Sequence, residues 1–318
     1  MRARSALGVG LAVAVVVWAP AAGYAAGDSH DLGGISSTTR ADAVAAMHGE
    51  AYAYAVYRAY AAEAADAGLE AVAKLFRDTA RQERYEHFAE LARLTDLVGS
   101  DVDNLTDAIA GERYEATVMY PAFARQARRD GCTAAAELFT EISGDEKRHA
   151  QWFAAARDAL MNPDADQRFP VGDRVPAGPI PAGLPRCTGQ TLANLDRAVH
   201  GEAFASLKYA LYAGHARLAG QPRLARLFTA AGSQERNEHF AEEAALAGLV
   251  RSTEANLRTA VAGEREEATI TYPAYRDRAA RHGDTGAARL FDELAHDEAR
   301  HASRFDDQYG SSRGRHAR

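Results

Sequence analysis

The stretch AIAGERYEATVMYPAF, residues 108–123, indicates the fold of this chain. Read at about 3.6 residues per turn, its apolar residues form one stripe of a helix, and Glu112 and Glu115 lie in that stripe. An unpaired carboxylate is costly to bury, so something cationic must meet these two side chains. A pair of metal ions is the candidate that suits them.

A closely similar motif, AVAGEREEATITYPAY, recurs at residues 260–275, with Glu264 and Glu267 at the positions that correspond to Glu112 and Glu115. Glu50 and Glu202 are likewise 152 positions apart, and this offset holds through both halves without insertion or deletion. The chain is therefore predicted to be a tandem duplication of one whole domain.

The composition of each half predicts four helices. Each half is rich in Ala, Glu, Arg and Leu and lacks the alternation of β-branched and polar residues that is typical of strands. In the first half the predicted helices run from about 41 to 66, 69 to 97, 104 to 130 and 134 to 160, and each has a carboxylate on its apolar face. This pattern is typical of a metal-centred four-helix bundle. We predict four-helix domains at 38–160 and 190–310. Segment 161–189 holds six of the ten prolines, which predicts an extended linker.

Composition and the N-terminus bear on where the protein acts. The net charge of −7, without a long basic run, argues against nucleic acid as a partner. Residues 1–25 combine Arg2 and Arg4, an apolar run and a small-x-small cleavage site, which predicts a secretory signal peptide, with an uncleaved anchor as the alternative. We expect a secreted or extracytoplasmic protein without stable membrane association after cleavage. There, Cys132 and Cys187 either form a disulfide or are two unrelated thiols.

Each half distributes carboxylates and histidines over its four helices at spacings of three or four residues, which put the side chains of one motif on one helical face. Carboxylate and imidazole donors suit iron or manganese, so we predict two dinuclear metal sites, iron first and manganese as the alternative. A network of buried salt bridges or surface charges is the competing interpretation. The candidate ligands are Glu50, Glu83, Glu86, His87, Glu112, Glu115, Glu146 and His149, and in the second half Glu202, Glu235, Glu238, His239, Glu264, Glu267, Glu298 and His301.

These motifs support a resemblance to a known family. HGE at 48–50, QERYEH at 82–87, AGERYEATVMYPAFA at 110–124 and DEKRH at 145–149, with their counterparts in the second half, resemble the diiron domain of rubrerythrin, in the ferritin-like superfamily. The resemblance implies an all-α fold of two tandem ferritin-like four-helix bundles. It also implies that Glu115 and Glu267 can leave the iron on reduction.

Four tyrosines near the motifs are further candidates for a role in catalysis. Their hydroxyls either bond to ligand carboxylates, or the rings are ordinary core aromatics. They are Tyr57, Tyr120, Tyr209 and Tyr272.

The chain departs from the family pattern in three ways. The second helix usually reads Glu-x-x-His, whereas here Glu86 and Glu238 hold the third position and His87 and His239 the fourth. We favour the histidines as ligands, with the glutamates as the alternative. The cysteine-rich rubredoxin module is absent, so turnover needs an external electron donor. The predicted export also differs, since typical relatives are cytoplasmic.

The resemblance implies a nonhaem dimetal oxidoreductase that reduces hydrogen peroxide, with oxygen as the other small-molecule oxidant. The alternatives are a ferroxidase or iron-binding protein without peroxidase turnover, manganese catalase-like dismutation, and a structural bundle with vestigial ligands. The chain is expected to be a monomer, as a pseudo-dimer, or a homodimer.

The connection between the second and third helices bears on which helices share a site. These helices run parallel in a ferritin-like bundle, so their connection has to return along it, a distance of about 33 Å. The seven steps from Leu97 to Asn104 reach about 25 Å when extended. This favours a bundle in which the first two helices of one half pack on the last two of the other. Fraying each helix by two residues would close the gap, so unexchanged bundles are the alternative.

Overall fold

The computed structural model describes residues 34–162 and 169–316, and in this part helices are the only regular secondary structure. The predicted signal peptide, residues 1–25, lies outside the described residues. The helices of the first half are α1 (Ser37–Asp66), α2 (Glu70–Gln82), α3 (Phe88–Leu94), α4 (Asp101–Tyr114), α5 (Tyr120–Arg129) and α6 (Thr133–Met161). Those of the second half are α7 (Gly189–Leu218), α8 (Pro222–Gln234), α9 (Phe240–Ala247), α10 (Thr253–Glu266), α11 (Tyr272–Arg281) and α12 (Thr285–His316).

Local polar contacts set the helix ends. At the start of α1, the hydroxyl of Ser36 accepts a hydrogen bond of 3.2 Å from the backbone N–H of Thr39. Ser100 and Asp103 form a capping box at the start of α4. Gly68 makes the turn after α1 with φ at +74°, a conformation that a side chain would strain. These ends lie within a few residues of the predicted ones.

The second and third helices of each half are not regular α-helices. A five-residue π-helical turn interrupts each one and begins at a glutamate of the predicted sites; these turns are η1 (Glu83–His87), η2 (Glu115–Met119), η3 (Glu235–His239) and η4 (Glu267–Thr271). In η1 the N–H of Phe88 donates to the carbonyl of Glu83, five residues back. Pro121 follows η2 in the first turn of α5, where its missing N–H is tolerated.

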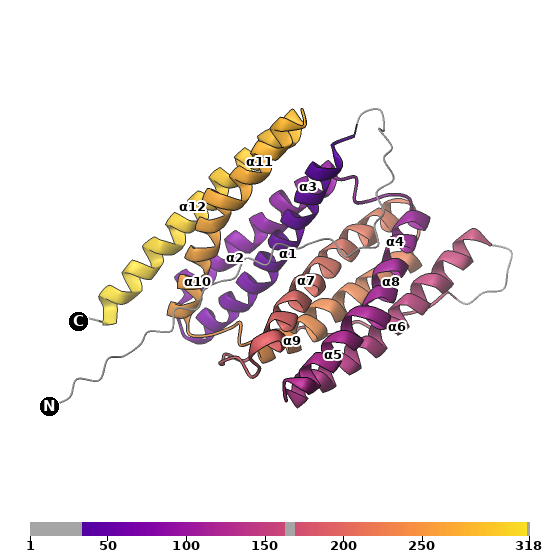
Figure 1. Cartoon of the computed structure of the whole chain (residues 1–318), viewed down its shortest axis with the longest axis horizontal. Coiled ribbons are helices and arrows are strands. Elements are labelled where there is room, and N and C mark those ends of the chain that lie inside the picture. Colours follow the sequence, from indigo (N-terminus) through magenta and orange to yellow (C-terminus); the bar gives the residue numbers. More distant parts are fainter. Residues whose placement is uncertain (1–33, 163–168, 317–318) are drawn as a thin grey trace. The chain divides into compact units, whose positions relative to one another are not determined.

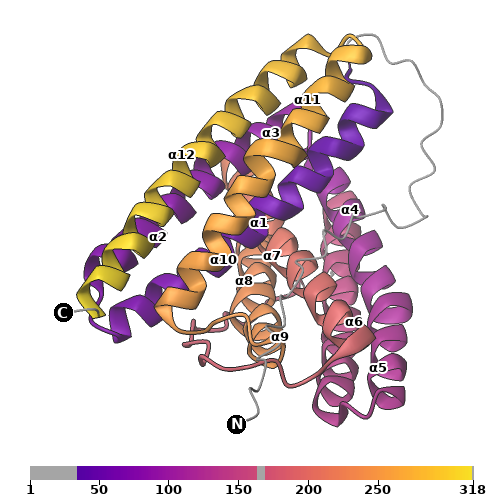
Figure 2. The ribbon, with the colours of Figure 1, turned by 60° about the vertical axis from the view of Figure 1, so that its left-hand side comes forward.

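The helices form two four-helix bundles, and each bundle takes helices from both halves (Figures 1 and 2). Helices α1 and α2–α3 pack with α10–α11 and α12, whereas α7 and α8–α9 pack with α4–α5 and α6. Residues 95–100, between α3 and α4, therefore lead from one bundle into the other. This is the exchanged arrangement that the short connection favoured. The segments 38–160 and 190–310 are consequently not separate bundles.

Helices α1 and α7 lie against each other where the two bundles meet. The ring of His48 stacks on Phe204 with 4.1 Å between centroids, and Tyr52 stacks on His200 at 3.9 Å. Both histidines therefore belong to this contact between α1 and α7.

Residues 169–188 run along α8 and α9 without forming a helix. The N–H of Val175 donates to the Ser233 hydroxyl at 3.0 Å, and the N–H of Gly183 donates to the carbonyl of Val250 at 2.9 Å. At the end of this segment Cys187 forms a disulfide with Cys132, 55 positions earlier. Of the two states that the sequence left open for the cysteines, the structure has the bridge.

None of the helices in the described ranges is both long and apolar enough to cross a membrane.

Candidate metal centres

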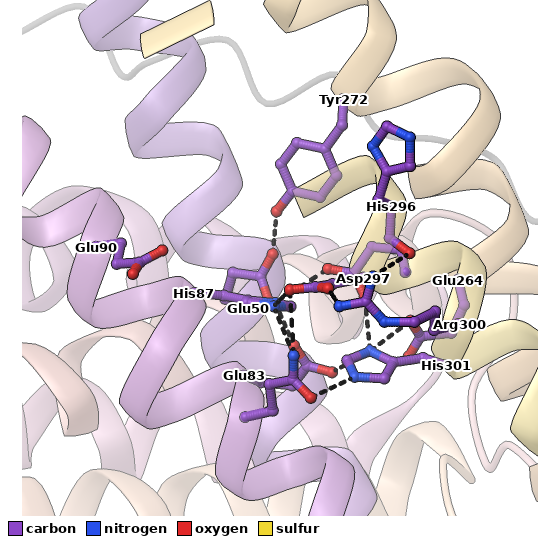
Figure 3. A network of polar contacts seen from close by, with 12 residues as sticks. Glu50, Glu83, His87, Glu90, Glu264, Tyr272, His296, Asp297, Arg300 and His301 are labelled. Atoms are coloured by element: carbon purple, nitrogen blue, oxygen red, sulfur yellow. Dashed lines mark hydrogen bonds and ion pairs between the residues drawn. The ribbon is translucent and has the colours of Figure 1, made fainter. Parts of the chain in front are cut away.

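Each bundle holds one buried cluster of carboxylates and imidazoles. Figure 3 shows the cluster that contains His87 and His301. The first centre consists of Glu50, Glu83, His87, Glu264, Glu298 and His301, and the second of Glu202, Glu235, His239, Glu112, Glu146 and His149. All of these residues are at most 2% exposed. Each centre draws its members from four helices and from both halves, so neither half contains a complete centre by itself.

The geometry around His87 shows why a cation fits the first centre. Its Nδ1 lies 2.7 Å from an oxygen of Glu83, 3.1 Å from one of Glu298 and 3.3 Å from one of Glu50. One N–H donates well to one acceptor, so it cannot satisfy three carboxylates. Both oxygens of Glu83 lack a hydrogen bond of good geometry within the described residues. Oxygen and nitrogen donors that converge in this way suit a dinuclear iron or manganese site.

The electrostatics of the clusters favour a cation as well. Burial raises the pKa of Glu50 to about 8, and the nearby Glu298 adds to this rise. Burial likewise raises the pKa of Glu202 to about 7. Burial alone would lower the pKa of His87, but the surrounding carboxylates raise it well above its usual range. Bound cations would relieve this repulsion between buried carboxylates.

Aspartate and glutamine side chains hydrogen-bond to the Nε2 atoms of the cluster histidines and so orient the rings. The sequence analysis did not identify these residues. In the first centre, Nε2 of His87 lies 3.3 Å from Asp297, and Arg300 pairs with the same aspartate (Figure 3). Nε2 of His301 lies 3.0 Å from the side-chain oxygen of Gln82. These contacts use the Nε2 atoms and leave the Nδ1 atoms to bind metal. Outer hydrogen-bond partners commonly orient metal-binding histidines in this way.

The second centre repeats both contacts. Asp145 lies 3.3 Å from Nε2 of His239, and the side-chain oxygen of Gln234 lies 3.0 Å from Nε2 of His149. The signal was available in the sequence, since both residue types recur at the same offset as the ligands.

The four tyrosines all donate to cluster carboxylates, and each donates across the duplication. Tyr57 bonds to Glu264 and Tyr272 to Glu50 in the first centre. In the second centre, Tyr120 bonds to Glu202 and Tyr209 to Glu112. Of the two roles left open for these hydroxyls, the structure therefore has the hydrogen bond to a candidate ligand.

Glu115 and Glu267 lie at the edges of the centres and are only partly buried. Burial and the neighbouring carboxylates raise the pKa of each well above the usual range for glutamate. The HGE motifs lie beside these two side chains. A Cβ at Gly49 would be 3.3 Å from an oxygen of Glu267, and one at Gly201 would be 3.8 Å from an oxygen of Glu115. Glycine therefore leaves room for Glu267 at position 49, whereas a Cβ at position 201 would make only an ordinary contact.

The π-helical turns explain the shifted histidines. A π-turn contains one residue more than an α-turn, so the fourth position after Glu83 takes the place that the third would take in a regular helix. His87 is accordingly buried in the first centre, whereas Glu86 is exposed and contributes to no cluster among the described residues. Glu238 is partly buried and lies near Asp145 and His239, outside the main ligand group.

The duplication is also visible in a comparison with protein families. The family model described as Rubrerythrin matches residues 44–156 and again 193–309, well over half of the chain. The chain belongs to the rubrerythrin family. Rubrerythrin-family proteins bind diiron centres, and the two buried clusters are compatible with such sites. The predicted tandem ferritin-like architecture is thereby confirmed.

Curated members of the rubrerythrin family are similar over part of their length. Nigerythrin from Nitratidesulfovibrio vulgaris is 34% identical over 137 residues, which are 39% of this chain and 67% of that protein. Rubrerythrin from Porphyromonas gingivalis is 34% identical over 131 residues, which are 37% of this chain and 66% of that protein. The chain thus spans about two thirds of the length of these relatives. No solved structure matches it significantly.

Proposed function

We propose that each centre holds two metal ions, iron first, and that the protein reduces hydrogen peroxide to water with electrons from an external donor. The observation that carries this proposal is the pair of buried clusters, each with carboxylates and two histidines from four helices. When bound, two ferrous ions supply the two electrons that one peroxide molecule takes up together with two protons. Membership in a family that binds diiron centres supports the choice of metal.

The side chains of this protein have distinct tasks in that proposal. The buried glutamates and histidines bind the ions, and the aspartates and glutamines behind the histidines hold the rings in one orientation. The four tyrosines keep four carboxylates in place by hydrogen bonds. Glu115 and Glu267, which are partly exposed at the edge, are the carboxylates that we expect to move when a small oxidant approaches.

The first test is metal content. Because both centres contain the full donor set, the purified protein should bind about four iron ions per chain, two per centre. Metal binding should also raise the melting temperature, since it stabilises the folded state by mass action. A content near two would mean that one centre is inactive, and a content near zero would contradict the proposal.

The second test is peroxide consumption by the iron-loaded protein, with and without a reductant. Sustained consumption only with reductant supports the peroxidase. One round of iron oxidation without turnover would instead identify a ferroxidase or iron store. Sustained consumption without reductant, together with manganese in the protein, would identify dismutation.

We also propose that the protein is exported through the signal peptide at residues 1–25. The disulfide between Cys132 and Cys187 supports this, because disulfides persist in oxidising compartments. Fractionation of the native cells, with N-terminal sequencing of the mature protein, tests the proposal. An intact N-terminus in the cytoplasmic fraction would contradict it.

A further inference from the structure

The two centres have matching ligands but different surroundings. Glu243 lies beside the second centre, on α9, and its counterpart 152 positions earlier is Leu91, beside the first centre. Both side chains are fully buried, at 0% exposure. The duplication therefore provides an internal comparison in which one apolar core residue has been replaced by a carboxyl group.

Glu243 is linked to the second centre through a tyrosine. The hydroxyl of Tyr120 lies 3.1 Å from Oε1 of Glu243 and also bonds to Oε1 of Glu202, a candidate metal ligand. In the first centre the corresponding Tyr272 bonds to Glu50, while Leu91 offers no polar atom. The second centre thus has a chain of three polar groups where the first has two.

The single hydroxyl proton of Tyr120 limits the hydrogen bonds that it can donate. A phenol has one proton and cannot donate to two carboxylates at once, so one of the two acids must donate to the tyrosine oxygen. Glu202 lies 3.5 Å from Nδ1 of His239, whereas Glu243 forms no ion pair among the described residues. Lys208, a buried cation on α7, pairs with Asp107 at 2.8 Å. Glu243 is therefore the second carboxyl group that Tyr120 meets, and it lies outside the metal cluster.

Burial raises the pKa of Glu243 well above its usual range, and the charge of Glu202 adds to that effect. The Tyr120 hydroxyl is the polar link between Glu243 and Glu202. Hydrogen bonds in such a chain polarise and strengthen one another in a buried setting.

We propose that Glu243 is a positioning residue that makes the two metal centres unequal, because it holds Tyr120 and, through it, the Glu202 carboxylate ready for metal. The second centre should then bind metal more tightly than the first and fill before it. The proposal depends on the metal binding proposed above.

The test is an anaerobic titration of the metal-free full chain with Fe(II), followed by calorimetry. The wild-type protein should show two classes of sites that differ about fivefold in affinity, which is roughly what one buried hydrogen bond is worth. E243L copies the first centre and should bring the two classes together. E243Q keeps a polar hydrogen-bond partner for Tyr120 and should retain the difference. Thermal unfolding of each metal-free variant checks that it is folded.

The outcomes separate this inference from the proposed function. A single class of sites in the wild-type protein, or two undiminished classes in E243L, would overturn the role of Glu243 while leaving metal binding intact. If E243Q behaved like E243L, the hydrogen-bonded positioning would be wrong. Absence of Fe(II) binding would overturn both proposals.

Discussion

At the scale of single residues, the position of His87 depends on one extra residue in a helical turn. The spacing of Glu83 and His87 looks like a departure from the family when it is read on a regular helix. In the π-helical turn it places the imidazole in the cluster and leaves Glu86 in solvent. The sequence contained the signal, since the same shift occurs at Glu235 and His239, but regular helical periodicity gives no means of interpreting it.

Substitution of this histidine tests the assignment. H87A should weaken Fe(II) binding at the first centre by about tenfold or more, because it removes a direct ligand. E86A is the matched control and should change the affinity by less than about twofold, since an exposed surface substitution has little effect. Calorimetric titration of the metal-free proteins measures both. The reverse ranking would transfer the ligand role to Glu86.

The glycines of the HGE motifs make a second residue-scale prediction. G49A should displace the edge carboxylate of Glu267, because its Cβ would lie 3.3 Å from Oε1. We expect Fe(II) affinity at the first centre to fall by about fivefold, equivalent to about 1 kcal/mol. G201A places its Cβ 3.8 Å from Glu115, an ordinary contact, and should leave binding unchanged.

Unfolding experiments complete that comparison. G201A should stabilise the metal-free protein by about 0.5–1 kcal/mol, since alanine loses less conformational freedom than glycine in a helix. Equal effects of G49A and G201A on metal binding would show that Glu267 does not need the space.

At the scale of elements, the disulfide joins the start of α6 to the start of α7 and closes a long loop. Cys132 and Cys187 are 55 positions apart, which corresponds to about 4 kcal/mol of stabilisation in the chain-entropy model. C132S/C187S should therefore lower the free energy of unfolding by about 2–4 kcal/mol while metal content stays the same. Denaturant unfolding with metal analysis measures this. Loss of metal without loss of stability would show that the bridge shapes a centre instead.

At the scale of the whole molecule, the exchange of helix pairs makes each half incomplete. The fragment 28–162 contains α1 to α6, and so it has ligands of both centres but the full set of neither. Expressed alone, it should form an obligate dimer in which two copies exchange their helix pairs, and it should bind metal only as that dimer. Light scattering combined with metal analysis measures this. A stable monomer with a complete two-metal site would contradict the exchange.

The sequence by itself determined the helices, the duplication and the residue types of the donor set. These features depend on local periodicity, which places Glu112 with Glu115, or Glu146 with His149, on one helical face wherever that helix packs. A repeated motif also shows directly that the same chemistry occurs twice. The tandem four-helix architecture could therefore be predicted before any contact was known.

Only the tertiary structure decided which helices share a centre, and which side chains hydrogen-bond to the ligands from outside the cluster. Because the two halves have matching ligands, the exchanged and unexchanged bundles satisfy the same sequence pattern, and the short segment 95–100 could only favour one of them. The contacts of Gln82 with His301 and of Glu243 with Tyr120 join residues more than a hundred positions apart. Such contacts depend on how the helices pack in three dimensions, which the period of a single helix does not specify.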